Sequence, residues 1–241
     1  MANDQAKELC FHYAFRWPDS RKQDFHISLR EESLEIVPEK REVYPEWVRL
    51  SYCQCSVCPL KEEDHPQCPI ASNLIDVISF AKDELSHQEI DVEIDCEART
   101  YRKKTSLQNA LSSLIGIYMA TSGCPIMDNL RPLVRTHLPF ATLQETTYRT
   151  VSMYLLAQYF LWKQGKTPDW GLTQLKNLYG QIQQVNEGFR KRIAAIHKED
   201  AGLNAVIHLN CYAWFTNISL LEKDLDEIKR FFSAYLSSGT S

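Results

Sequence analysis

The spacing of apolar residues changes along this chain, and that change limits the folds open to it. Apolar and polar residues alternate in three segments, 11–17, 25–29 and 90–96, with the period of two that marks strands with one buried face. From residue 105 onward, apolar residues recur every three or four positions, as they do on one face of a helix. The sequence therefore predicts an α+β fold, in which a small antiparallel sheet and one helix precede a mostly helical bundle.

The same change of spacing predicts the domain organisation. We expect residues 1–105 to form a β-rich α+β region and residues 106–241 to form an α-helical domain. Alternating apolar residues at 47–52 predict one more strand in the first region. In the second region, Thr142 and Glu145 have the spacing of a capping box, which predicts the start of a long helix.

Directly after the strand expected at 47–52 comes a cluster of metal-ligand residue types. Four cysteines and one histidine fall within sixteen residues: Cys53, Cys55, Cys58, His65 and Cys68. Thiolate and imidazole donors this close together are typical of a structural zinc site, which needs four of them in a tetrahedron. Since five donors are present, either Cys53 or His65 is expected to be spare. The sequence predicts a Cys-rich metal knuckle, with zinc as the expected cofactor.

Two other interpretations of the cysteines stay open. An iron–sulfur cluster is one alternative, because Cys58, Cys68 and Cys124 each precede a proline, although the usual Cys-x2-Cys-x2-Cys spacing is absent. Such a cluster would make the protein a redox or sensor protein. The second interpretation is a set of reduced, inert cysteines that hold no metal. The remaining cysteines occur singly: Cys10, Cys96, Cys124 and Cys211.

A second candidate site surrounds Cys124. If a helix begins near this residue, Cys124, Asp128, Arg131 and Arg135 share one face of it, and His137 follows. A thiol at a helix N-terminus is favoured as thiolate, and His137 could act as its base. The two arginines could bind a small anionic ligand through forked hydrogen bonds. A thiol-dependent enzyme is therefore an alternative function, and whether the protein is an enzyme stays undecided. The simpler interpretation is a buried cysteine beside surface ion pairs.

Charge and hydropathy argue against two classes of partner. The chain has 27 Lys and Arg against 31 Asp and Glu, a net charge of −4, so it lacks the positive field that gathers nucleic acid. No segment is both long and apolar enough for a membrane span. Residues 1–5 do not begin a basic segment followed by an apolar core, so no secretory signal is expected. We expect a reducing, cytoplasmic location, with an unknown protein or a small anionic ligand as partner.

Five short motifs in combination carry a resemblance to a known family. They are Cys-x2-Cys-Pro-Leu at 55–60, Cys-Pro-Ile-Ala at 68–71, Arg-Thr-Tyr-Arg-Lys at 99–103, Ala-Thr-Ser-Gly-Cys-Pro at 120–125 and His-Leu-Pro-Phe-Ala-Thr at 137–142. The chain resembles an uncharacterised family of bacterial proteins, a domain of unknown function. The resemblance implies a bacterial, cytoplasmic context and no particular reaction. Together with the knuckle, it favours a zinc-containing binding or regulatory protein.

Overall fold

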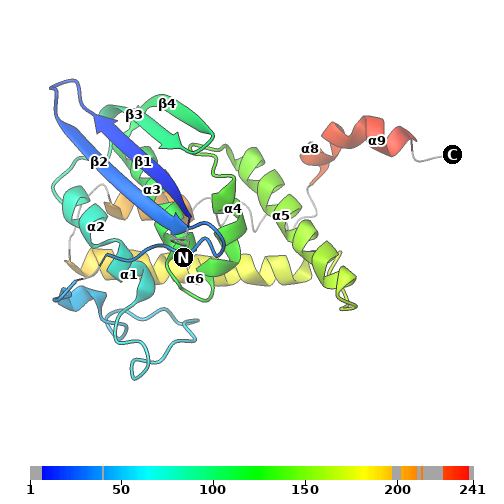
Figure 1. The fold of residues 1–241 in the computed structure, drawn as a ribbon, viewed down its shortest axis with the longest axis horizontal. Helices are drawn as coiled ribbons and strands as arrows, with labels where there is room; N and C mark the ends of the chain where they lie inside the picture. The colour runs from blue at the N-terminus through cyan, green and yellow to red at the C-terminus, as the bar shows by residue number, and fades with distance from the viewer. Residues whose placement is uncertain (1–6, 40, 197–201, 211–212, 214–224, 239–241) are drawn as a thin grey trace, which may run out of the picture. The chain divides into compact units, whose positions relative to one another are not determined.

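The computed structural model of the chain describes residues 7–39, 41–196, 202–210, 213 and 225–238. Its architecture is α+β, as predicted: a four-stranded antiparallel sheet is accompanied by helices that make up most of the second half of the chain (Figure 1). Cys211 lies outside the described residues. Among the residues that are described, no helix has the length and apolar character needed to cross a bilayer.

The sheet is built from two hairpins. Strands β1 (Glu8–Arg16) and β2 (Lys22–Arg30) form the first, and β3 (Glu89–Cys96) and β4 (Arg99–Ser106) form the second. The order β2-β1-β3-β4 joins the hairpins through an antiparallel pairing of β1 with β3. One face carries the predicted alternating apolar residues, which are buried: Leu9, Phe11, Tyr13, Phe15, Phe25, Ile27, Leu29, Ile90, Val92 and Ile94.

Helices connect and follow the strands. Those in the first half are η1 (Glu46–Val48), α1 (Pro69–Asn73) and α2 (Ile75–Ala81). After the sheet come α3 (Leu107–Thr121), η2 (Met127–Leu130), α4 (Arg131–Arg135), α5 (Leu143–Lys163) and α6 (Thr173–Ile196). A helical segment at 202–210 precedes α8 (Asp226–Lys229), η3 (Arg230–Phe232) and α9 (Ser233–Ser238).

The core forms where the buried face of the sheet meets α2 and α3. Phe80 of α2 packs edge-on against Phe25, with 5.5 Å between ring centroids. The hydroxyl of Tyr13 lies 3.1 Å from Ser113 Oγ of α3, which supplies the hydrogen bond that a buried phenol needs. Burial of each such side chain contributes about 1.5–3 kcal/mol. This core holds α3 in place, and the end of α3 leads to Cys124.

Residues 47–52 do not form the predicted strand. The segment begins with the 3-10 helix η1, and its only bridge is an isolated pair between Arg49 and Gln67. The alternating residues Val48 and Leu50 are buried, as expected, at 0% and 1% exposure. Their backbone groups pair within the same loop instead of with the sheet: Leu50 N–H, for example, donates to the carbonyl of Pro66 at 2.9 Å. Alternation predicted the burial correctly and the strand wrongly.

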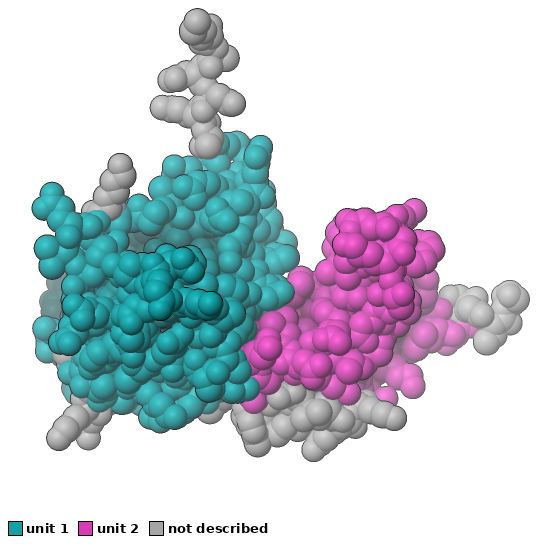
Figure 2. Space-filling model, turned by 90° about the horizontal axis from the view of Figure 1, so that it is seen from below, with its two compact units in different colours: residues 1–140, 184–210 teal, residues 141–183, 211–241 magenta. Residues whose placement is uncertain are grey.

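The chain divides into two compact units, coloured separately in Figure 2. Unit 1 comprises residues 1–140 and 184–210, and unit 2 comprises residues 141–183 and 211–241. This division is by contacts and does not fall at residue 105. That residues 1–105 and 106–241 form two separate domains remains a prediction. All residues of the candidate site described below belong to unit 1.

Helix α5 of unit 2 begins with the predicted capping box. Thr142 Oγ1 accepts a hydrogen bond from Glu145 N–H at 3.2 Å, and the Glu145 carboxylate accepts one from Thr142 N–H at 2.7 Å. Two N–H groups that lack partners within the helix are satisfied in this way.

We expect Thr142→Ala to lower the free energy of unfolding by about 1 kcal/mol, because it leaves one helix-terminal N–H without its side-chain acceptor. Chemical denaturation of the two proteins measures the difference. Ser152→Ala, at an exposed position within the same helix, is the control and should cause no loss. An unchanged midpoint for Thr142→Ala would show that this cap contributes nothing to global stability.

Candidate metal centre

The knuckle, residues 55–58, is a tight turn. Cys58 N–H donates to the carbonyl of Cys55 at 3.0 Å, and both cysteines are partly buried. Cys53 and His65, the other two loop donors considered from the sequence, are exposed. Cys53 also adopts a left-handed backbone conformation, with φ of 55°. The loop therefore turns Cys55 and Cys58 inward and leaves Cys53 and His65 at the surface.

Helix α6 passes very close to the knuckle. Cys55 Sγ donates a hydrogen bond to the carbonyl of Val185 at 3.8 Å, and Ser56 Oγ donates to Gln184 Oε1 at 3.0 Å. A Cβ atom at Gly188 would lie 2.6 Å from Cys55 Sγ and 3.2 Å from Cys55 Cα. Real Cβ atoms do not approach sulfur so closely, so this contact requires glycine at position 188.

Cys68 lies at the start of α1, and α1 connects it to the end of α3. The N–H of Cys68 donates to the carbonyl of Val48 at 2.8 Å, and the Cys68 side chain is only 9% exposed. Asn73, at the other end of α1, donates through Nδ2 to the carbonyls of Pro69 at 2.8 Å and Ser122 at 3.4 Å. These bonds hold the segment that begins at Cys68 against the loop that contains Cys124.

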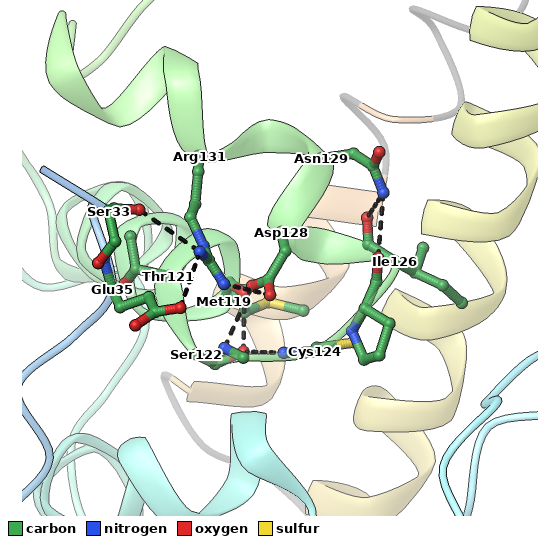
Figure 3. Close-up of polar contacts among 12 residues, drawn as sticks. Ser33, Glu35, Met119, Thr121, Ser122, Cys124, Ile126, Asp128, Asn129 and Arg131 are labelled. Atoms are coloured by element: carbon green, nitrogen blue, oxygen red, sulfur yellow. Dashed lines mark hydrogen bonds and ion pairs between the residues drawn. The ribbon is translucent and has the colours of Figure 1, made fainter.

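Cys124 follows α3 after a left-handed glycine, Gly123, with φ of +89°. Its N–H donates to Ser122 Oγ at 3.2 Å, and Gly123 N–H donates to the carboxylate of Asp128 at 3.1 Å (Figure 3). The cysteine is 7% exposed. The loop is thus closed on itself by short-range bonds, with the Cys124 thiol buried.

The prediction of one continuous helix beginning at Cys124 is wrong. A turn, the 3-10 helix η2 and the short helix α4 replace it. Pro132 is the second residue of α4, and a proline is best tolerated in the first turn of a helix, so a new helix begins there. Consequently Cys124 and Arg135 do not share one helical face.

The structure brings the thiols of four cysteines into one buried neighbourhood. Burial raises the pKa of Cys55 to about 12, and electrostatic repulsion from Cys68, Cys124 and Cys58 adds to the shift. Burial likewise raises the pKa of Cys124, an effect opposed by backbone N–H groups of Met127 and Ile126 and reinforced by Cys68 and Cys58. Three separate segments therefore contribute thiols that lie close enough to repel one another as thiolates.

The zinc ligand set expected from the sequence left out Cys124, which only the iron–sulfur interpretation grouped with Cys58 and Cys68. Cys124 lies far along the chain from the knuckle, beyond the sheet and α3, and spacing within one loop cannot reveal it. One signal was present: Cys124 precedes a proline, as Cys58 and Cys68 do. This shared Cys-Pro pair is the one feature of the sequence that groups the three cysteines.

The thiols are neighbours, but they are not arranged as a finished coordination site. Among the residues that the structure describes, no group of three or more His, Cys, Asp or Glu side chains could hold a metal ion as it stands. Coordination of one ion would require the four sulfurs to approach one another further. Their repulsion as thiolates opposes that approach, and a bound cation would reverse the repulsion.

The other residues of the second candidate site have partners of their own. Arg131 pairs with Asp128 and, at 3.3 Å, with Glu35 (Figure 3). Arg135 pairs with Glu97 at 3.3 Å. His137 Nε2 lies 2.7 Å from the hydroxyl of Tyr13. An anion approaching either arginine would compete with a carboxylate already in place.

We expect Cys124 to react slowly with iodoacetamide near neutral pH in chelator-treated protein that circular dichroism shows to be still folded. The thiolate is the nucleophile, and each unit by which burial raises the thiol pKa reduces the thiolate fraction about tenfold. Mass spectrometry of digested protein gives the rate at each cysteine. The exposed thiols of Cys10 and Cys53 are internal controls that should react first. If Cys124 reacts faster than both, it is an activated thiol and the enzyme alternative gains its main support.

Comparison with known proteins places the chain in a family. The model of DUF6901, a domain of unknown function, matches residues 11–233. The chain belongs to DUF6901. Comparisons with curated proteins and with solved structures gave no match. Membership of DUF6901 agrees with the uncharacterised family that the motifs resembled, and the cysteine neighbourhood lies entirely within the matched residues.

Proposed function

We propose that this protein binds one zinc ion through the thiolates of Cys55, Cys58, Cys68 and Cys124. The observation that carries the proposal is that these four thiols, two buried and two partly buried, come from three segments of the chain and lie within electrostatic reach of one another. Apolar packing alone gives no reason to gather four thiols in one place. A tetrahedral zinc ion accepts four thiolates at about 2.3 Å, and it would offset their mutual repulsion.

The zinc would have a structural role. Four protein ligands leave no open position for water or substrate, which is the arrangement of structural rather than catalytic sites. The ion would tie the 46–68 loop to the end of α3, and the knuckle is already held against α6. This makes the protein a binding or regulatory protein whose fold depends on metal, with a protein or a small anionic ligand as its unidentified partner.

The proposed ligand set differs from the one expected from the sequence in its fourth member. Cys53 and His65 are exposed, so either would have to turn inward to join the buried thiols. Cys124 is buried beside them and needs no such rearrangement of the loop. The choice of Cys124 therefore rests on burial and proximity.

An iron–sulfur cluster is the second candidate. Three of the four cysteines precede a proline, and backbone N–H groups of Met127 and Ile126 bond to the Cys124 thiol. Hydrogen bonds to the sulfurs are one of the means by which proteins tune such clusters. A redox or sensor protein would follow from this cofactor. The thiol-dependent enzyme has less support, because burial disfavours the Cys124 thiolate.

A cytoplasmic location in a bacterium is part of the proposal. All seven described cysteines are free thiols, and a tetrathiolate site requires a reducing compartment in which its cysteines are not drawn into disulfides. The motifs shared with a bacterial family support the same context.

Elemental analysis and an absorption spectrum of the full chain, purified without oxygen, test the proposal. About one zinc per chain and a colourless solution are expected. Iron with inorganic sulfide and a brown spectrum would overturn zinc in favour of the cluster. Replacement of the zinc by Co²⁺ adds a test of the ligands, because thiolate-to-cobalt charge-transfer bands grow with the number of sulfur ligands. Absence of any metal would overturn the proposal.

A further inference from the structure

Near Cys55, one of the four proposed ligands, lies an arginine that is buried as completely as a core leucine. Arg192 of α6 is 2% exposed. Its guanidinium donates hydrogen bonds of 2.5–3.2 Å to the carbonyls of Trp47, Arg49 and Leu50. It also lies over the ring of Tyr52, 5.9 Å from the centroid. Within the described ranges, no carboxylate comes within ion-pair distance of it.

Among the residues that the structure describes, this buried cation lacks a counter-charge. Hydrogen bonds to carbonyl oxygens satisfy its N–H groups, but those oxygens are dipoles and carry no net charge. Arginine does not lose its proton at any accessible pH, so it cannot escape the cost of burial by becoming neutral. Buried charges are therefore paired in most proteins. For Arg192, an anion must come from something other than the described carboxylates.

The thiol of Cys55, a proposed metal ligand, is within electrostatic reach of this cation. Gly188, which touches Cys55, lies four residues before Arg192 and thus one turn away on the same helix face. Arg192 lowers the pKa of Cys55, against the larger effects of burial and neighbouring thiols. The same loop that carries the knuckle also supplies the three carbonyls that Arg192 binds.

The charge of the centre depends on its ligand set. Zn²⁺ with four thiolates carries a charge of about −2, whereas three thiolates and a neutral imidazole give about −1. Among the groups that the structure describes around Arg192, thiolates bound to a metal would provide the anion that the guanidinium lacks, and four thiolates would provide the most.

We infer that Arg192 is the buried counter-charge of an anionic tetrathiolate metal centre. This inference rests on the proposed function. Arg192 is a positioning residue, because it also fixes the three carbonyls that precede the knuckle. The two contributions can be separated: lysine keeps the positive charge and loses the forked hydrogen bonds, whereas methionine keeps most of the volume and loses the charge.

The test compares zinc binding by the wild-type chain, Arg192→Lys and Arg192→Met, each in competition with a chromophoric chelator. Loss of an outer-shell partner typically weakens metal binding about 10–100-fold, and we expect this loss for Arg192→Met. Arg192→Lys should recover most of the affinity. The Co²⁺ spectrum should show four sulfur ligands in all three proteins. A variant whose metal site has lost its structure would show fewer.

Arg190→Met is the matched control. Arg190 lies on the same helix but forms a partly exposed ion pair with Glu187, at 2.7 Å, and its loss should leave zinc affinity unchanged. If Arg192→Lys binds zinc as weakly as Arg192→Met, the charge has no part and the inference is overturned. If Arg192→Met equals wild type, it is overturned as well.

The outcome also separates this inference from the proposed function. A wild-type chain that binds neither zinc nor Co²⁺ would overturn both the proposed function and the inference about Arg192. A wild-type chain that holds zinc tightly, with no difference among the variants, would remove the role of Arg192 alone. Should Arg192→Met fail to fold, Arg192→Lys still decides, because a weakening of 10–100-fold in that variant contradicts the inference.

Discussion

Cys124→Ser is expected to remove the bound zinc as completely as Cys58→Ser does. Each substitution deletes one of four thiolates, and a serine hydroxyl is a poor ligand for zinc because it is not ionised near neutral pH. The free energy of binding in structural zinc sites, about 10–16 kcal/mol in small zinc domains, is also folding free energy. Metal content should therefore fall from about one zinc per chain to nearly none, with a large loss of thermal stability. Elemental analysis and thermal unfolding followed by circular dichroism measure the two effects.

Cys53→Ser and Cys96→Ser are the controls for this prediction. Cys53 is an exposed cysteine of the same loop, and Cys96 is a partly buried one at the end of β3. Both variants should keep their zinc and melt near the wild-type temperature. A contrary result would be full zinc in Cys124→Ser together with loss of zinc in Cys53→Ser or His65→Ala. It would show that the fourth ligand is Cys53 or His65 of the loop, as the spacing of the loop donors predicts.

Gly188→Ala is expected to lower the free energy of unfolding by about 1–3 kcal/mol, the usual cost of overpacking a well-packed site. The added Cβ would lie 2.6 Å from Cys55 Sγ and 3.2 Å from its Cα, so a rotation of the side chain alone cannot relieve the contact. Cys55 must be displaced from α6. Zinc affinity should fall with stability, because Cys55 is a proposed ligand. Urea denaturation and chelator competition measure the two quantities.

Gly180→Ala is the control on the same helix. A Cβ at position 180 meets nothing within 4 Å, so the higher helix propensity of alanine should stabilise the protein by about 0.5–1 kcal/mol. The two glycine substitutions therefore have opposite expected signs. If Gly188→Ala also stabilises the protein, the close approach of α6 to the knuckle is not a feature of the folded chain.

Several elements could be predicted because their signals are local. The alternation at 11–17 and 90–96 corresponds to β1 and β3, since a strand with one buried face shows its period within a few residues. The Thr142–Glu145 capping box was confirmed for the same reason: the two side chains bond to each other's backbone. In such elements the sequence and the interaction span the same few residues.

Two segments were misjudged, each for its own reason. Alternation at 47–52 reflected burial, but the carbonyls of this segment are bound by Arg192, far along the chain. A buried loop of this kind shows the alternating apolar pattern of a strand, although the loop pairs with no strand. The helix expected at Cys124 was interrupted by a local turn and by Pro132, whose ring restricts how a helix continues through it.

The sequence by itself determined the α+β class, the strands β1, β2 and β3, and the presence of a cysteine-rich loop. Only the tertiary structure decided which thiols share one neighbourhood. Cys124 joins Cys55, Cys58 and Cys68 because the core between the sheet and α3 places the end of α3 beside α1. Arg192 enters the same region because α6 crosses the loop at a glycine. Ligand sets assembled from distant segments depend on packing, and packing between distant segments leaves no periodic trace in a single sequence.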